Sequence, residues 1–312
     1  MTSDKGVRIE RTGGDGRVGN GLATPQRHRE APELGDAGDG AATGPSIASS
    51  GRLPLRRRAR GSLVTTGSLA VCLLVWWGLA EWVFPPILFA SPARTVRAFV
   101  SMAGSGELFQ HIGSSLARIW AGFLLGSAVA IPAGLLMGTV SWTRRALEPY
   151  VEFFRFIPPI AFLPLAILWF GIGETSKIFL IFYCTVWIVL LNTMAGIFAI
   201  DPTKLRAARS LGFGQRDLFT RVMAPSSVPY IVTGMRIGMG NSFMTVVAAE
   251  MLAANTGIGY VIFSSRLFYQ TDKMFVGLIL LGVLGLLTDR LFRKLSGRLF
   301  GRYGVRDQVR ER

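Results

Sequence analysis

Three ionisable side chains, Arg155, Arg236 and Glu250, lie inside long apolar stretches of this 312-residue chain. Charged groups within a membrane are costly and often mark the path of a solute or an ion. Arg236 and Glu250 are 14 residues apart, about 21 Å along a helix, and would lie on nearly the same face. On that face Arg236 could attract an anion. In the alternative, Arg236 extends toward the membrane surface and Glu250 forms an ion pair at the opposite boundary.

Neutral polar side chains in the same apolar stretches could hydrogen-bond to a solute. Asn192, Asn241 and Thr245 are of this kind, although bonds between helices are the commoner use of such residues in membranes. Together with Arg236 and Glu250, they form the candidate translocation path.

The sequence offers no site for catalysis, for a metal ion or for a bound cofactor. It holds two cysteines within apolar runs and two distant histidines, from which no disulfide framework or metal cluster can be assembled. The phosphate-binding pattern G-x-x-x-x-G-K-[ST] does not occur, so ATP would have to be hydrolysed on another chain. The glycine pattern at residues 14–19 lies in a polar segment with no strand before it, and we treat it as a chance match.

The elements that would position these residues are membrane helices. Residues 1–62 contain no aromatic side chain and too little apolar surface to fold, which predicts a disordered tail. The remainder is predicted to be an all-α membrane protein, with a transmembrane domain over residues 63–295 and a basic tail over residues 296–312. Six apolar stretches predict six transmembrane helices, at Leu63–Phe84, Leu116–Val140, Pro149–Phe170, Ile178–Ile200, Tyr230–Ala254 and Met274–Leu291.

Prolines and glycines add detail to this bundle. The third predicted helix contains Pro158, Pro159 and Pro164 and should be kinked. The loop before the second predicted helix is long enough for a short interfacial helix at residues 95–102. Glycines spaced four apart should allow close helix packing, at Gly122/Gly126, Gly134/Gly138 and Gly234/Gly238.

The net charge of +15 is explained by topology rather than by binding to nucleic acid. Loops on the cytoplasmic side of a membrane are enriched in Lys and Arg. Basic residues gather before the first predicted helix, in residues 201–229 and after residue 288, whereas the opposite loops hold few. Both termini are therefore expected to be cytoplasmic.

Residues 201–229 are too long for a simple connection between two membrane helices. Asp201 is a suitable N-cap, Pro202 suits the first helical position, and Gly212 is a suitable stop. A second short helix is expected over residues 215–224, ended by Pro225. By composition this cytoplasmic hairpin could contact anionic lipid or dock a protein, whereas a DNA-binding role is improbable for a segment tethered between two membrane helices.

The same loop resembles the cytoplasmic "EAA" loop of binding-protein-dependent ABC importer permeases. In that family it reads Glu-Ala-Ala, three residues, Gly, nine residues, Ile, any residue, Leu-Pro, and here Arg206 stands in place of the Glu. The resemblance implies that this loop couples the chain to an ATPase. The coupling residues that it implies are Leu205, Arg206, Ala207, Ala208, Leu211, Gly212 and Pro225.

Further segments resemble the nitrate, taurine and aliphatic sulfonate subfamily of these permeases. They are Phe156–Pro159, Leu168–Glu174, Lys177–Phe179, Leu191–Thr193, Ala208–Gly212 and Ala248–Met251. The resemblance implies a type I ABC importer permease fold in a bacterial inner membrane. It also implies a permease homodimer, cytoplasmic ABC ATPase subunits and an extracytoplasmic solute-binding protein as partners, with a small anion as the solute.

Two other classes of protein stay open at this point. A secondary transporter or channel would favour a relay of buried Asp, Glu and His, of which the predicted helices hold few. A membrane-embedded enzyme would need a nucleophile or metal cluster near the membrane surface, which these residues do not provide.

Overall fold

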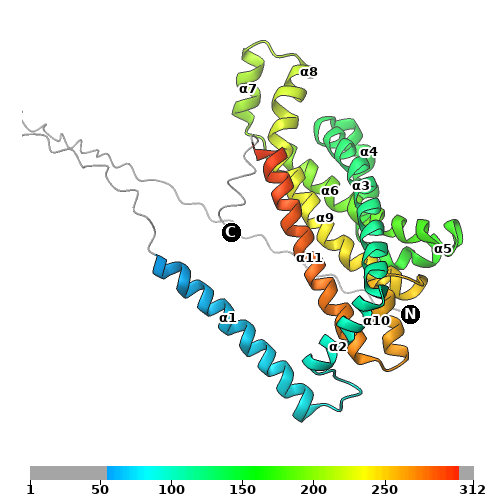
Figure 1. The fold of residues 1–312 in the computed structure, drawn as a ribbon. Helices are drawn as coiled ribbons and strands as arrows, with labels where there is room; N and C mark the ends of the chain where they lie inside the picture. The colour runs from blue at the N-terminus through cyan, green and yellow to red at the C-terminus, as the bar shows by residue number, and fades with distance from the viewer. Residues whose placement is uncertain (1–54, 302–312) are drawn as a thin grey trace, which may run out of the picture. The chain divides into compact units, whose positions relative to one another are not determined.

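The computed structural model describes residues 55–301, with side chains from residue 66 onward. In that part of the chain every regular element is helical (Figure 1). The elements are α1 Leu55–Gly78, η1 Leu79–Val83, α2 Pro92–Gly104, α3 Glu107–Thr139, α4 Ser141–Arg155, η2 Pro159–Phe162, α5 Leu163–Phe170, α6 Glu174–Phe198, α7 Pro202–Ser210, α8 Gln215–Asp217, η3 Leu218–Met223, α9 Ala224–Ala253, α10 Ile258–Leu267 and α11 Thr271–Leu299.

Both predicted tails differ from the structure where they overlap it. The predicted disordered segment 1–62 lies outside the described residues up to residue 54, but residues 55–62 form the first turns of α1. The predicted basic tail 296–312 likewise begins inside α11, which continues to Leu299, while residues 302–312 lie outside the described residues. Arginine and lysine are good helix formers, so polar residues extend both helices beyond their apolar centres.

Four of the described helices are long and apolar enough to cross a membrane: residues 66–83, α3, α6 and α11. Two bent pairs bring the total to six if each counts as one span. One pair is α4 with η2 and α5, bent by 90°, and the other is α8 to α9 with α10, bent by 47°. The kink predicted for the third span is confirmed; because a residue that precedes proline avoids the helical conformation, the chain breaks between α4 and η2.

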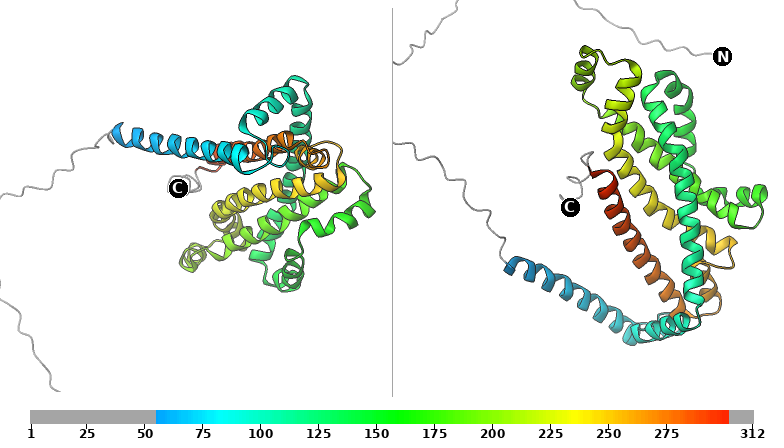
Figure 2. Two further views of the ribbon diagram at one scale, coloured as in Figure 1. Left: turned by 90° about the horizontal axis from the view of Figure 1, so that it is seen from below. Right: turned by 45° about the horizontal axis from the view of Figure 1, so that its top comes forward.

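Helices α3, α6 and α9 pack side by side and form the centre of the bundle (Figure 2). Glycines of α3 make the close approach possible, as the four-residue spacing predicted. A Cβ added at Gly122 would lie 2.5 Å from the Cβ of Ile181, and one at Gly126 would lie 2.8 Å from the Cβ of Thr185. No larger side chain fits at these positions without moving α6.

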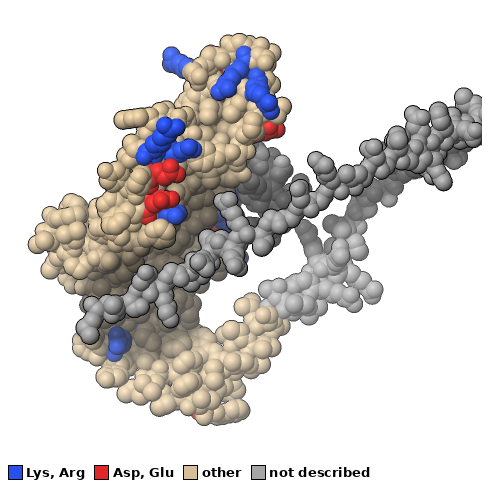
Figure 3. All heavy atoms as spheres, turned by 180° about the vertical axis from the view of Figure 1, so that it is seen from behind, with Lys and Arg blue, Asp and Glu red and all other residues tan. Residues whose placement is uncertain are grey.

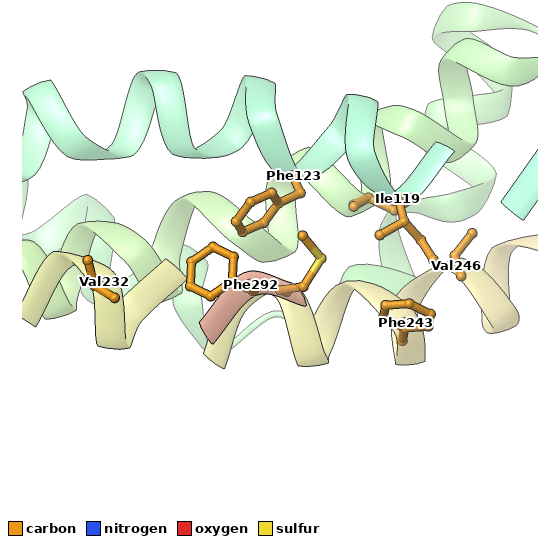
Figure 4. Packing of buried hydrophobic residues seen from close by; sticks show 8 residues of the cluster. Ile119, Phe123, Val232, Phe243, Val246 and Phe292 are labelled. Carbon is orange, nitrogen blue, oxygen red and sulfur yellow. The ribbon is translucent and has the colours of Figure 1, made fainter. Parts of the chain in front are cut away.

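Aromatic and branched side chains fill the space between α3, α9 and α11 (Figure 4). Phe123 of α3 meets Phe292 of α11 edge to face, with ring centroids 6.2 Å apart. Ile119 and Phe123 lie against Phe243 and Val246 of α9 in the same cluster. This apolar packing fixes α9, which carries most of the candidate path.

Two short-helix regions lie at opposite ends of the bundle. Helices α7 and α8 lie at one end, and α2 and α10 lie at the other (Figures 1 and 2). The short helix predicted at residues 95–102 is confirmed as α2. Helix α3 begins at Glu107, nine residues before the predicted Leu116, because a polar first turn precedes its apolar centre.

The prediction that Pro225 ends the second loop helix is wrong. Helix α8, η3 and α9 follow one another without interruption, through Pro225 and Pro229 as far as Ala253. The π-helix η3 widens the turn in front of Pro225: the N–H of Ala224 donates to Phe219 O, five residues back. Pro225, which has no N–H to donate, lies directly after this widened turn and continues the helix.

Candidate functional site

The predicted coupling loop, residues 201–229, begins with a well-formed helix cap. The Oδ1 of Asp201 accepts a hydrogen bond from the N–H of Thr203 at 2.7 Å, and Pro202 occupies the first helical position of α7. This bond lowers the pKa of the Asp201 carboxyl below its ordinary value. The prediction of an N-cap at Asp201 is confirmed.

The other end of α7 is fixed by a left-handed glycine. Gly212 has φ +83°, a conformation that side chains with a Cβ rarely adopt. The N–H of Gly212 donates to Arg209 O at 2.9 Å, and the N–H of Phe213 donates to Ala208 O at 3.2 Å. This pair of bonds is the Schellman arrangement, which satisfies the last carbonyls of α7 and turns the chain sharply.

The residues predicted for coupling divide into an outward-facing and a packed group. Arg206, Ala207, Leu211 and Gly212 are exposed, and Leu211 is 77% exposed. Ala208 is buried, and Leu205 and Pro225 are half-buried, on the side where α7 contacts η3. Lys and Arg side chains gather at this end of the molecule (Figure 3). The loop therefore presents an exposed leucine and basic groups on a rigid, capped turn.

Arg236 lies on α9 beside a cavity between α9 and α11. Its Nε and Nη2 donate to the carboxylate of Asp289 at 2.6 and 3.2 Å, and Arg293 also reaches that carboxylate at 3.0 Å. The side chains of Arg236 and Asp289 are 41% and 30% exposed. The cavity has a volume of about 200 Å³ and is lined by Arg236, Met239, Gly240, Phe243, Gly285, Asp289 and Phe292.

Glu250 is fully buried at the end of α9 and uses both carboxylate oxygens. Its Oε1 accepts from Arg118 Nη1 at 2.7 Å, and the hydroxyl of Ser115 donates to it at 2.8 Å. Its Oε2 accepts from the N–H of Gly259 at 2.9 Å. Glu250 therefore joins α3 to the first turn of α10. It does not line the cavity beside Arg236.

The first amides of α10 are satisfied by side chains from other helices. The N–H of Gly257 donates to His111 Nδ1 at 3.0 Å, and the N–H of Ile258 donates to Ser115 Oγ at 2.9 Å. With the bond from Gly259 to Glu250, three successive amides have acceptors on α3 and α9. Gly257, at φ +122°, leaves no room for a Cβ beside the Glu250 carboxylate. These contacts fix the 47° bend between α9 and α10.

The sequence model of one protein family covers most of this bundle. The family is described as the binding-protein-dependent transport system inner membrane component, and its model matches residues 130–301, more than half of the chain. The chain belongs to this family. The matched region includes α6, the whole predicted coupling loop, α9 and α11.

Relatives of this permease share most of its length. A probable ABC transporter permease of Brucella melitensis biotype 1 is 42% identical over 213 residues, which cover 68% of this chain and 87% of the relative. The taurine transport system permease protein TauC of Escherichia coli K12 is 36% identical over 254 residues, 80% of this chain and 91% of TauC. Among solved structures, the inward-facing methionine ABC transporter MetNI aligns with a TM-score of 0.54 at 18% identity, over 62% of this chain and 94% of that chain. That similarity supports the fold.

In this permease the neutral polar residues of the candidate path bond within their own helices. Asn192 donates to Ile188 O at 2.8 Å, and Asn241 donates to Ile237 O at 3.0 Å. Thr245 donates to the carbonyl of Asn241 at 3.0 Å. Asn192 also fills the space beside the backbone of α9 at Gly234. The structure thus gathers none of the three around the cavity beside Arg236.

Sequence reasoning overlooked the partners of the buried charges. Asp289, the partner of Arg236, lies near the end of the sixth predicted helix, and its spacing of four from Arg293 is a signal for an ion pair. The loop charges suggest that Arg118 lies near a membrane boundary and Lys177 in an outer loop, but Arg118 is only 3% exposed and Lys177 only 4% exposed. The spacing of three between Glu174 and Lys177 at the start of α6 was a second signal for a pair.

Proposed function

We propose that this permease subunit forms, with a second copy of itself, the membrane path of an ATP-driven importer for a small sulfonate or a similar anion. Membership of the permease family carries this proposal. The solute-binding protein and the ATPase are separate chains in this scheme, and ATP is hydrolysed only on the ATPase. The ends of the chain and the predicted coupling loop face the cytoplasm, in line with the distribution of Lys and Arg.

The shape of the predicted coupling loop favours docking to a protein over contact with lipid. The capped and Schellman-closed α7 is rigid, and it holds Leu211 outward at 77% exposure. A single rigid apolar anchor among basic groups suits a groove in a partner protein. A lipid-bound helix would instead present a continuous apolar face, which α7, with Leu205 half-buried, lacks.

We infer the class of solute from the name of a relative and from the position of Arg236. The name of TauC assigns taurine, an amino sulfonate, to a protein that is 36% identical to this chain. Arg236 places a guanidinium beside the cavity between α9 and α11, and its partner Asp289 is partly exposed. An arginine in this position could attract a sulfonate or nitrate group. Asn192, Asn241 and Thr245 would reach a solute only if they exchanged their present bonds.

Co-purification with the cognate ATPase tests the docking role. We expect deletion of residues 205–213 to abolish co-purification while membrane insertion is retained. Leu211→Asp should do the same with a minimal change, because it places a charge at the exposed anchor. Thr220→Asp, at another exposed position on η3, is the control and should leave assembly intact. A complex that survives the deletion would show that the loop does not dock the ATPase.

Two further measurements test whether ATP is hydrolysed on a separate chain and which class of solute is imported. The purified chain alone should hydrolyse no ATP above background, since its sequence lacks a phosphate-binding loop. The solute-binding protein encoded beside this permease should bind taurine or another aliphatic sulfonate more tightly than an uncharged analogue. ATP-independent uptake of the solute by the chain alone would favour a secondary transporter instead.

A further inference from the structure

Two buried cations and two carboxylates form a cluster near the junction of α9 and α10. The cations are Arg118 of α3 and Lys177 of α6, and the carboxylates are Glu174 of α6 and Glu250 of α9. Arg118, Lys177 and Glu250 are at most 4% exposed, whereas the side chain of Glu174 is 59% exposed. The charges balance, but only one of the four groups can reach solvent.

Arg118 contacts the two carboxylates through different atoms. Nη1 donates to Glu250 and to the carbonyl of Thr256, both at 2.7 Å. Nε and Nη2 donate side by side to the two oxygens of Glu174, with Nη2 to Oε1 at 2.8 Å. Nη2 also donates to the hydroxyl of Thr256 at 2.9 Å. The Glu174 carboxylate can therefore leave without disturbing the bond between Arg118 and Glu250.

The position of the Glu174 carboxylate is suited to an anion in general. Its Oε1 receives both Arg118 Nη2 and Lys177 Nζ at 2.8 Å. The Nε and Nη2 edge of a guanidinium binds two oxygens of a carboxylate, sulfonate or phosphate equally well. The site also lies at the start of the 25-residue helix α6, where the helix dipole favours negative charge.

Departure of Glu174 would leave a buried positive charge that needs another anion. Arg118 would keep Glu250, but Lys177 would lose the carboxylate that it contacts. An unpaired buried ammonium is strongly unfavourable, so a replacement anion would stabilise the charged form of Lys177. The side chain of Glu174 is 59% exposed, so its carboxylate is the member of the cluster that solvent can reach and that an arriving anion could replace.

We propose that Arg118 and Lys177 form a binding site for a single oxyanion of the sulfonate or phosphate type, which the Glu174 carboxylate occupies when no such anion is bound. The proposal rests on the proposed function for its preferred ligand, a small sulfonate. The site lies toward the end of the bundle that carries α10, away from the predicted coupling loop. An arriving anion would exchange with Glu174 there.

Titration of the full-length permease with ethanesulfonate tests this exchange. The protein is reconstituted in phosphatidylcholine nanodiscs, and affinity is measured by isothermal titration calorimetry. Glu174→Gln removes the internal competitor and should bind ethanesulfonate at least about tenfold more tightly than the wild type. Glu148→Gln is the matched control, since it removes an exposed carboxylate on α4 and should behave as the wild type. Equal affinities of these two variants would overturn the proposal.

Two more variants test whether the gain in affinity for ethanesulfonate depends on the loss of the internal carboxylate and on the cations. Glu174→Asp retains an internal carboxylate and should return the affinity toward that of the wild type. Lys177→Gln added to Glu174→Gln should remove the gain, and a gain that persists there would place the anion elsewhere. Thermal unfolding of each variant confirms that it is folded.

Nanodiscs of different lipid composition distinguish a soluble anion from a lipid phosphate as the ligand of this site. In nanodiscs with phosphatidylglycerol, a weaker affinity of Glu174→Gln for ethanesulfonate would assign the lipid phosphate as a competitor at the same cations. An unchanged affinity would assign the cations to the soluble anion. Failure of the titration would leave the docking role intact, because that role is measured by co-purification with the ATPase at the opposite end.

Discussion

Replacing Glu250 with glutamine should destabilise the permease strongly, although the two side chains have nearly the same shape. The change removes the charge that compensates Arg118, which is 3% exposed. It also turns an amide NH₂ toward the donors of Ser115 and Gly259, which now point at a carboxylate. Removal of one partner from a buried ion pair costs about 3–5 kcal/mol. The loss of the acceptor for the Gly259 N–H, which alone costs about 1–3 kcal/mol, is counted as part of that loss.

The measurement is the free energy of unfolding in mixed micelles, from a reversible SDS titration followed by circular dichroism. Glu148→Gln is the control, because it makes the same substitution in an exposed pair with Arg144 at 3.9 Å. That pair should contribute less than about 1 kcal/mol. A difference of under 1 kcal/mol between the two variants would refute the role assigned to Glu250.

A double-mutant cycle shows whether the loss of stability comes from the interaction between Arg118 and Glu250. Arg118→Met alone should also destabilise, because it leaves Glu250 buried and uncompensated. The double variant Arg118→Met with Glu250→Gln should be more stable than the sum of the single losses predicts, by at least about 1 kcal/mol. Additive losses would mean that Arg118 and Glu250 act independently, which the 2.7 Å contact between them contradicts.

Two other predictions concern packing and capping. Gly126→Val should prevent close packing of α3 on α6, since even a Cβ would lie 2.8 Å from Thr185 Cβ. Gly282→Ala on α11, with open space around it, should not lower thermal stability, because alanine is the better helix former. Asp201→Ala should speed amide exchange at the start of α7 several-fold, whereas Asp201→Asn should keep the cap. Because the folded-state pKa of Asp201 is lowered, its contribution is present above the pKa of the unfolded chain and is lost as pH falls through the lowered value. The protection factors of the Asn variant, which correct the exchange rates for their intrinsic pH dependence, should not change over that pH range. Equal pH dependence of the protection factors in both proteins would exclude the cap as the cause.

The sequence predicted those features that depend on neighbouring residues. The ends of α7 follow from Asp201 and Gly212, because caps and left-handed stops act over a few residues. The kink before Pro159 follows from the same local rules. The course of the chain at Pro225 did not follow, because the π-helix η3 in front of it changes the hydrogen-bonding register.

The charged contacts were beyond local reasoning, because their partners are distant in sequence. Arg118 and Glu250 are 132 residues apart, and Arg236 and Asp289 are 53 residues apart. A count of charges in loops places Arg118 at a membrane boundary but cannot pair it with a residue on another helix. The topology of α3, α6 and α9 supplies that pairing, and the sequence pattern fixes only which helices exist.

The two charged residues of α9 therefore belong to different parts of the permease, although helical spacing places them on nearly one face. Glu250 is sealed between α3 and α10 by three hydrogen-bond donors, and two of them, the Ser115 hydroxyl and the Gly259 N–H, carry no charge. Arg236 and Asp289 are partly exposed beside a cavity, and Arg293 offers Asp289 a second partner. A pair with an alternative partner and solvent access can rearrange at low cost, whereas a sealed pair cannot. Arg236 is thus a charge that can exchange partners, whereas Glu250 is a fixed structural contact between α9, α3 and α10.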